Sequence, residues 1–187
     1  MCGIAGYVGD RESADVLVDA LSKLEYRGYD SAGIAVFDHG NIKVKKCKGR
    51  LANLVEKMDE EGKPQGHVGI GHTRWATHGE PSDINSHPHG NKRVTIVHNG
   101  IIENYKKLKD FLVGEGYSFA SETDTEVAAK LLDYYYDGDP MKTIAKVLSE
   151  IKGSYALGIM FRDFPDEIFA VRKDSPLIVG VGEHENF

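Results

Sequence analysis

The order of short strands and helices along the chain constrains its fold more than any other feature of the sequence. Apolar runs and alternations predict strands at 31–37 and 42–47, on either side of the turn sequence His39-Gly40-Asn41. Further strands are predicted at 3–8, 68–75, 94–99, 154–161, 167–172 and 177–181. Helical spacing predicts helices in two groups, 13–24 with 51–59, and later 105–114, 125–136 and 141–151. Short strands joined by hairpins, with helices in two groups, favour an α+β fold with mainly antiparallel sheets.

Length and charge exclude several classes of function. The 187 residues suit one domain, and 23 basic against 29 acidic residues give a formal charge of −6. This balance argues against nucleic-acid binding, and the basic residues between 43 and 50 are interpreted as the solvated face of a hairpin. No apolar run approaches the ~20 residues of a membrane helix. With two cysteines and charged residues at 10–12 instead of an apolar secretion signal, we expect a cytoplasmic protein without membrane contact.

Cys2 directly follows the initiator methionine, which is clipped efficiently before small residues. Removal of Met1 would leave a thiol and a free α-amine on one residue. An ordinary cysteine is only a few per cent thiolate at neutral pH and needs a base beside it. An α-amine has a pKa of roughly 7.7–8.0, close to the pH at which a general base works best. Cys2 is therefore a candidate nucleophile that carries its own base, although it could also simply fill space at the start of a strand.

The loop predicted at 76–93 lies within a histidine-rich region, because six of the eight histidines fall between 67 and 98. A metal site is the first hypothesis to test for such a cluster. The region lacks a His-Glu-x-x-His pattern, the chain has no Cys-x-x-Cys, and His87-Pro88-His89 has no acid at a known ligand spacing. We therefore predict neither a metal nor a cofactor. A loop of this length in a compact domain is usually functional or disordered.

Polar residues at two predicted strand ends could bind an anion. Arg74 could hold a carboxylate in a bidentate pair. Asn99 offers a side-chain amide and Gly100 an unobstructed backbone N–H, which are the parts of an oxyanion hole. The Asn-Gly pair could equally be a plain hairpin turn. The segment 121–126, which contains Asp124, is interpreted first as a helix cap.

These segments together resemble the class II glutamine amidotransferases. The resemblance rests on Cys2-Gly3-Ile4, on the segments 72–79, 98–100 and 121–126, and runs along essentially the whole chain. It implies the fold of the N-terminal-nucleophile hydrolases, a four-layer αββα sandwich of two mainly antiparallel sheets. Two longer segments, 26–33 and 72–89, are most similar to the members of the family that transfer ammonia to fructose 6-phosphate.

The resemblance also implies roles for individual residues. Cys2 would be the nucleophile and would form a glutamyl thioester, with its own amine shuttling the proton. The Asn99 side chain and the Gly100 backbone would stabilise the oxyanion. Arg74 would bind the α-carboxylate of glutamine and Asp124 its α-ammonium group. The rest of the pocket would be shaped by Trp75, Thr77 and His78, and Arg27 would position the N-terminus.

The resemblance leads us to expect residues 1–187 to be a glutaminase domain, truncated at its C-terminal end. L-glutamine would be its substrate, whereas fructose 6-phosphate would bind only to sugar-isomerase domains that this sequence does not contain. The full-length enzyme would be a homo-oligomer. Two alternatives stay open: a glutaminase domain of another class II amidotransferase, such as the phosphoribosylpyrophosphate type, or a non-catalytic or metal-binding module with the same fold.

Overall fold

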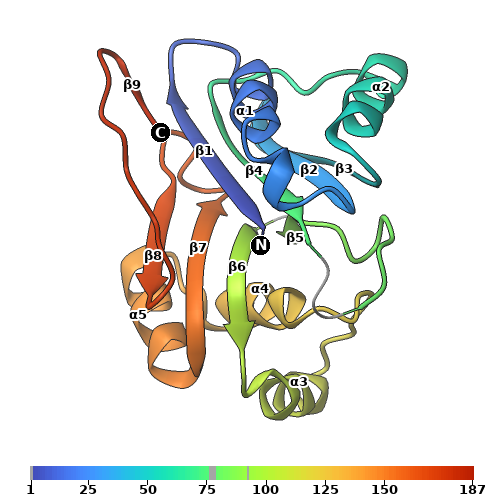
Figure 1. Cartoon of the computed structure of the whole chain (residues 1–187). Coiled ribbons are helices and arrows are strands. Elements are labelled where there is room, and N and C mark those ends of the chain that lie inside the picture. Colours follow the sequence, from blue (N-terminus) through green and yellow to red (C-terminus); the bar gives the residue numbers. More distant parts are fainter. Residues whose placement is uncertain (1, 76–78, 92) are drawn as a thin grey trace.

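The computed structural model describes residues 2–75, 79–91 and 93–187, which form four layers. Two β-sheets pack face to face, and helices cover the outer face of each sheet (Figure 1). This is the predicted αββα arrangement. No helix in the described part of the chain is long and apolar enough to cross a membrane.

The first sheet has five strands in the order β3-β2-β4-β1-β9, with every pairing antiparallel. Its strands are β1 Gly3–Gly9, β2 Ser31–Asp38, β3 Asn41–Lys48, β4 Val68–Arg74 and β9 Glu185–Asn186. Its outer face is covered by the helices α1 Ser13–Ser22 and α2 Leu51–Glu61. A short 3-10 helix, η1 Glu25–Arg27, connects α1 to β2 and lies against the end of β4.

The second sheet has four strands in the order β5-β6-β7-β8, again antiparallel. Its strands are β5 His89–Gly90, β6 Val94–Ile102, β7 Gly153–Phe161 and β8 Phe169–Lys173. Its outer face is covered by the helices α3 Tyr105–Gly114, α4 Asp124–Tyr135 and α5 Pro140–Glu150.

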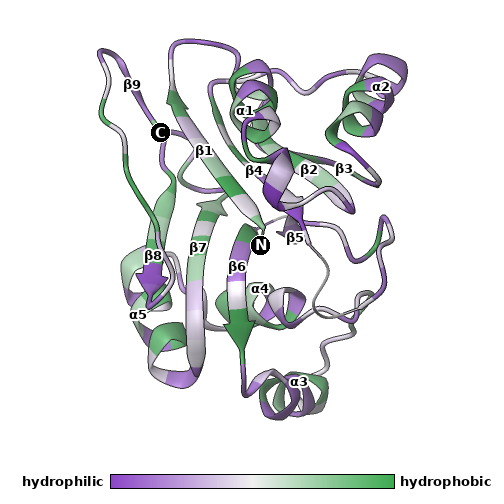
Figure 2. Ribbon diagram, viewed as in Figure 1, coloured by the Kyte–Doolittle hydropathy of each residue, from purple (hydrophilic) through white to green (hydrophobic). Residues whose placement is uncertain are grey.

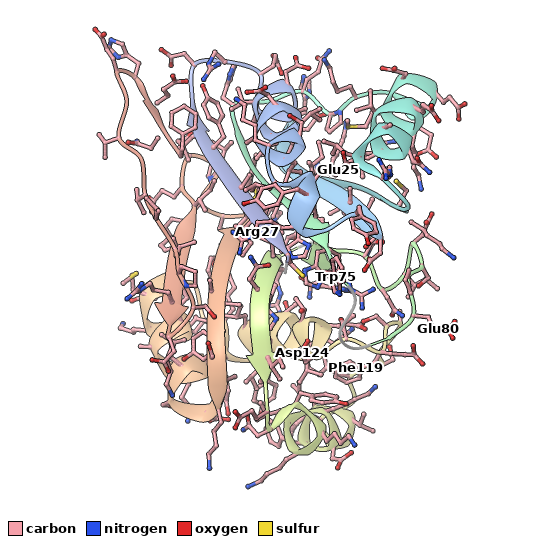
Figure 3. The ribbon with its side chains drawn as sticks, viewed as in Figure 1. Glu25, Arg27, Trp75, Glu80, Phe119 and Asp124 are labelled. Carbon is pink, nitrogen blue, oxygen red and sulfur yellow. The ribbon has the colours of Figure 1, made fainter. Side chains whose placement is uncertain are left out.

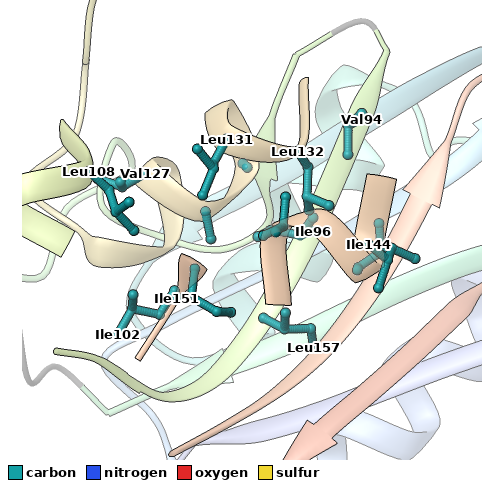
Figure 4. Close-up of a cluster of buried hydrophobic side chains, with 14 of the residues drawn as sticks. Val94, Ile96, Ile102, Leu108, Val127, Leu131, Leu132, Ile144, Ile151 and Leu157 are labelled. Carbon is teal, nitrogen blue, oxygen red and sulfur yellow. The ribbon is translucent and has the colours of Figure 1, made fainter. Parts of the chain in front are cut away.

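Three hydrophobic cores hold the four layers together. The largest lies between the second sheet and its helices, where Ile96 and Leu157 meet Leu131 and Ile144 (Figure 4). A second core packs α1 and α2 on the first sheet. The third lies between the sheets, where Ile70 of β4 is buried with Val97 of β6. Figure 2 shows that hydrophobic and hydrophilic residues are interleaved along these strands and helices, as expected for elements with one buried face.

Most of the predicted elements are confirmed, with ends that differ by at most three residues. The strand predicted at 177–181 is wrong. This segment is an exposed extended arm, with Ile178 87% and Val181 84% exposed, and it bonds to the residues that follow it through a backbone pair between Gly180 and Phe187. Its apolar alternation resembles a strand, but only its end reaches a neighbour, where Val181 forms an isolated bridge with Asn186 of β9, the last strand.

The interpretation of the basic hairpin face is wrong for Lys46. Its Nζ donates to the backbone oxygens of Ile84, Ser86 and Pro88 at 3.2, 2.7 and 3.2 Å. Lys46 therefore holds the loop between β4 and β5 against the first sheet. The carbonyl groups of this loop have no partners in a sheet, and the Lys46 ammonium group supplies the hydrogen-bond donors that they need.

Candidate active site

A cavity of about 590 Å³ opens where the two sheets meet, beside the N-terminal end of β1. It is lined by residues from both sheets, from η1 and from the start of α4. All of the predicted site residues that the structure describes lie on its wall, namely Cys2, Arg27, Arg74, Trp75, Asn99, Gly100 and Asp124. Figure 3 shows Arg27 and Trp75 near the start of β1, with Asp124 in α4 below them. Thr77 and His78 lie outside the described residues.

Cys2 stands immediately before β1 and faces the end of β4. Pairing of Gly3 with Thr73 in the first sheet places Cys2 next to Trp75. The backbone N–H of Trp75 donates to the Cys2 Sγ at 3.2 Å, and the Trp75 oxygen lies 3.5 Å from the same sulfur. Burial raises the pKa of the Cys2 thiol above its ordinary value. The sulfur is therefore protonated at neutral pH, and its use as a nucleophile requires a base.

Asn99 and Gly100 lie within β6, which continues to Ile102. The interpretation of Asn-Gly as a hairpin turn is therefore wrong. The Asn99 Nδ2 donates to the backbone oxygen of Cys2 at 3.2 Å. Gly100 has a φ of +124°, and a Cβ at this position would lie 2.1 Å from the Ser154 oxygen. Only glycine fits this backbone, and Gly100 lies on the cavity wall without a side chain.

Arg74 ends β4 and is only 4% exposed. One guanidinium nitrogen donates to the Gly79 oxygen at 3.0 Å, which fixes the side chain against the loop that follows β4. The backbone of Arg74 accepts a bond from the Asp30 N–H, and Gly28 packs so closely on it that a Cβ would lie 2.9 Å from the Arg74 carbonyl carbon. The sequence thus places a buried cation at a fixed position on the cavity wall.

Asp124 is the first residue of α4, and Thr123 caps the helix by accepting from the Glu126 N–H at 3.2 Å. The interpretation of 121–126 as a helix cap is confirmed. Asp124 Oδ2 accepts from the Ile102 N–H at 2.8 Å, and Oδ1 lies 3.9 Å from the His98 Nδ1. The carboxylate is thus buried, fixed to the end of β6, and also part of the cavity wall.

The sequence matches a known family over more than half of its length. Residues 72–186 match the glutamine amidotransferase domain family. The chain belongs to this family. A glutamine–fructose-6-phosphate aminotransferase of Clostridium tetani is 59% identical over 189 aligned residues, which cover 100% of this chain and 31% of that protein. The protein of the same name from Thermus thermophilus is 52% identical with the same coverage.

Solved structures agree with the family of this amidotransferase domain. A glutamine phosphoribosylpyrophosphate amidotransferase from B. subtilis superposes with a TM-score of 0.85 at 27% identity, covering all of this chain and 41% of that one. A class-II glutamine aminotransferase domain protein from Silicibacter pomeroyi gives a TM-score of 0.66 at 15% identity, over 95% of this chain and 79% of that one. The latter likeness concerns the fold alone. The predicted fold of the N-terminal-nucleophile amidotransferases is confirmed.

Sequence reasoning missed that histidines of this amidotransferase domain are buried together beside the site, where His87 also lines the cavity. The rings of His72 and His87 have centroids 4.1 Å apart, and those of His87 and His89 lie 5.0 Å apart. Desolvation holds the pKa of His72 at about 3 and those of His87 and His89 well below their ordinary value. No group of three or more potential ligands in the described ranges is arranged to hold a metal ion. The signals in the sequence were the concentration of histidines between 67 and 98 and a histidine that follows the apolar start of strand β4.

Trp75 forms the rim of the cavity and is 46% exposed. Its ring meets that of Tyr29 edge to face, with centroids 5.3 Å apart. The Cys2 sulfur contacts both the backbone N–H and the carbonyl oxygen of Trp75, so the rim of the cavity and the thiol are held together.

Proposed function

We propose that this domain hydrolyses the side-chain amide of L-glutamine to glutamate and ammonia. The observation that carries the proposal is that Cys2, Asn99, Gly100, Arg74 and Asp124 line a single cavity. These residues come from four parts of the fold that are distant in the sequence, namely the start of β1, the end of β4, β6 and the start of α4. A thiol, an amide donor, a bare backbone N–H and two opposite charges form a set that matches an amino-acid amide.

The reaction requires removal of Met1, which exposes the α-amine of Cys2. The amine takes the thiol proton as the sulfur attacks the amide carbon, and a tetrahedral intermediate forms. The amine then gives the proton to the leaving nitrogen, so ammonia departs and a glutamyl thioester is left on Cys2. A water molecule attacks the thioester with the same amine as base, which releases glutamate and restores the thiol. The raised pKa of the thiol is the reason that a base is needed.

Two further groups of residues serve this chemistry. The Asn99 amide donates to the Cys2 backbone, and Gly100 lines the same cavity. The Asn99 amide and the Gly100 N–H would stabilise the negative oxygen of both tetrahedral intermediates. Arg74 would bind the α-carboxylate of glutamine and Asp124 its α-ammonium group, because these two buried charges lie on the wall of the same cavity. Arg27, in η1 on this wall, would position the N-terminus.

The ammonia would serve a larger reaction in a longer protein. The chain spans 31% of the length of the curated relatives that it matches, and their names specify fructose 6-phosphate. We assign residues 1–187 to the glutaminase part of such a protein, with the sugar phosphate bound elsewhere. Ammonia from glutamine would then convert fructose 6-phosphate to glucosamine 6-phosphate. The phosphoribosylpyrophosphate type is less well supported, since the structure of that type is 27% identical and the fructose-6-phosphate relatives are 59% identical.

Glutamate release from glutamine by the Met1-free chain tests the proposal. Cys2→Ala should abolish the activity, whereas Cys47→Ala, a matched change at the buried cysteine of β3, should leave it nearly intact. A chain that retains Met1 should be inactive as well. Equal activity of Cys2→Ala and the unmodified chain would refute the proposal.

A further inference from the structure

His72 contacts the proposed oxyanion donor from outside the cavity. It lies in the middle of β4, between Ile4 of β1 and Gly33 of β2 in the sheet register. Its side chain is fully buried, and it is not one of the described residues that line the cavity. His72 Nε2 lies 3.0 Å from the Asn99 Oδ1 and 3.0 Å from the backbone oxygen of His98. A histidine of the first sheet therefore reaches across to Asn99 in β6 of the second sheet.

The partners of His72 fix its tautomer. A backbone oxygen can only accept hydrogen bonds, so the contact with His98 requires a proton on Nε2 of His72. The Asn99 atom that faces Nε2 must then also be an acceptor, which makes it the amide oxygen. One Nε2–H is thus shared between two oxygens.

A second carbonyl group fixes Asn99 independently. The backbone oxygen of Cys2 accepts from the other end of the Asn99 amide, so that end must be the NH₂ group. A flipped amide would place its oxygen against the Cys2 oxygen and its NH₂ group against the Nε2–H of His72. Both hydrogen bonds would then be lost. The NH₂ group has two hydrogens, of which Cys2 takes one, and the second is available to an oxyanion in the cavity.

We propose that His72 is a positioning residue for catalysis: its Nε2–H holds the Asn99 amide with the NH₂ group toward Cys2. The proposal rests on the glutaminase function proposed above. His72 acts only through Asn99, because it is buried behind the cavity wall and meets no substrate.

The environment of His72 suits such a role. Its ring packs on that of His87, and its Nδ1 has no hydrogen-bond partner among residues 2–75, 79–91 and 93–187. A buried acceptor without a partner destabilises the fold, and an apolar side chain at this place would avoid that cost. Burial also keeps the ring neutral, with a pKa of about 3, so that Nε2 is a donor and Nδ1 an acceptor throughout the neutral range.

A double-mutant cycle on the Met1-free chain tests the proposal, with kcat and KM measured from glutamate release. His72→Leu should lower kcat by about tenfold or more, which is less than the roughly 10²–10³ expected for loss of the donor itself, with a KM change below about twofold. In an Asn99→Ala background, His72→Leu should change kcat by less than about twofold, since the amide that His72 positions is gone. His72→Gln, whose amide nitrogen occupies the place of Nε2, should recover most of the lost turnover.

Additive losses in the two backgrounds would overturn the proposal, because His72 would then act by another route. A KM effect without a kcat effect would also overturn it. Glutaminase activity of the unmodified chain and its loss in Cys2→Ala report separately on the proposed function. Should His72→Leu fail to fold, nitrogen-15 NMR of the unmodified chain decides the question: a neutral ring protonated on Nε2 is expected, and a ring protonated on Nδ1 would overturn the proposal.

Discussion

Acidification should destabilise this domain steeply, because three neutral histidines are buried at its active site. His72, His87 and His89 have folded-state pKa values below 6.5, which is the ordinary value for the unfolded chain. Below pH 6.5 the unfolded chain takes up protons that the native chain does not, so the free energy of unfolding falls as the pH falls. The loss continues until the pH nears the folded-state pKa, which is about 3 for His72.

The magnitude follows from proton linkage. Each group changes stability by about 1.4 kcal/mol per pH unit once its unfolded form is protonated. Between pH 7 and pH 5 a histidine that stays neutral in the folded chain removes about 2 kcal/mol, and three such histidines remove about 6 kcal/mol. That is a large part of the roughly 5–15 kcal/mol of a typical domain. Carboxylates with lowered pKa values, such as Asp38 at about 2, stabilise the folded chain at pH 5 and above. They lose this stabilisation only as the pH falls from about 4 toward their folded-state pKa.

Urea unfolding followed by circular dichroism at several pH values between 5 and 7 measures this slope. His87→Phe should reduce it by about one third, since one of three groups is removed. His184→Asn, a change at an exposed histidine with a φ of +59° that asparagine tolerates, should leave it unchanged. A free energy of unfolding that varies by less than about 2 kcal/mol over this range would refute the reasoning, because it corresponds to one buried histidine or none.

Three further predictions concern single residues. Asn99→Ala should lower kcat by roughly 10²–10³ with a smaller effect on KM, and a pure KM change in steady-state assays would contradict the oxyanion role. Asp124→Asn should discriminate against glutaramic acid, which lacks the α-amine, far less than the unmodified chain does, and unchanged discrimination would rule out the ammonium contact. Lys46→Met should lower the free energy of unfolding by about 1.5–3 kcal/mol by removing charged hydrogen bonds to three carbonyl groups, whereas Lys48→Met on the exposed face should have little effect in the same urea assay.

The elements of this fold could be predicted where local periodicity and packing agree. The helix at 105–114 was predicted with its observed ends, because one apolar face and a closing glycine define it. The segment 177–181 was not, because alternation alone cannot tell how much of a segment pairs with a neighbour, and here the pairing is confined to its end, where Val181 bridges Asn186. Lys46 shows the same limit for side chains, since its carbonyl partners come from a loop forty residues later in the chain.

Sequence reasoning selected the side chains of the candidate site but not their surroundings. Cys2, Arg74 and Asn99 could be chosen because each combines reactive chemistry with a predicted strand end. That these ends meet at one cavity depends on how two sheets pack, which no local pattern specifies. His72 was overlooked as a positioning residue because a histidine in an apolar strand has no partner visible in the sequence. The roles assigned to these residues stay predictions.

The most direct test of the account is the site at which a glutamine-like diazo-ketone labels the chain. The Met1-free protein should be incubated with this electrophile and mapped by peptide mass spectrometry, beside a chain that retains Met1. We expect one adduct, on Cys2, that forms only in the Met1-free chain and is prevented by excess glutamine. Labelling of Cys47, or equal labelling with Met1 in place, would contradict a nucleophile that uses its own α-amine as base.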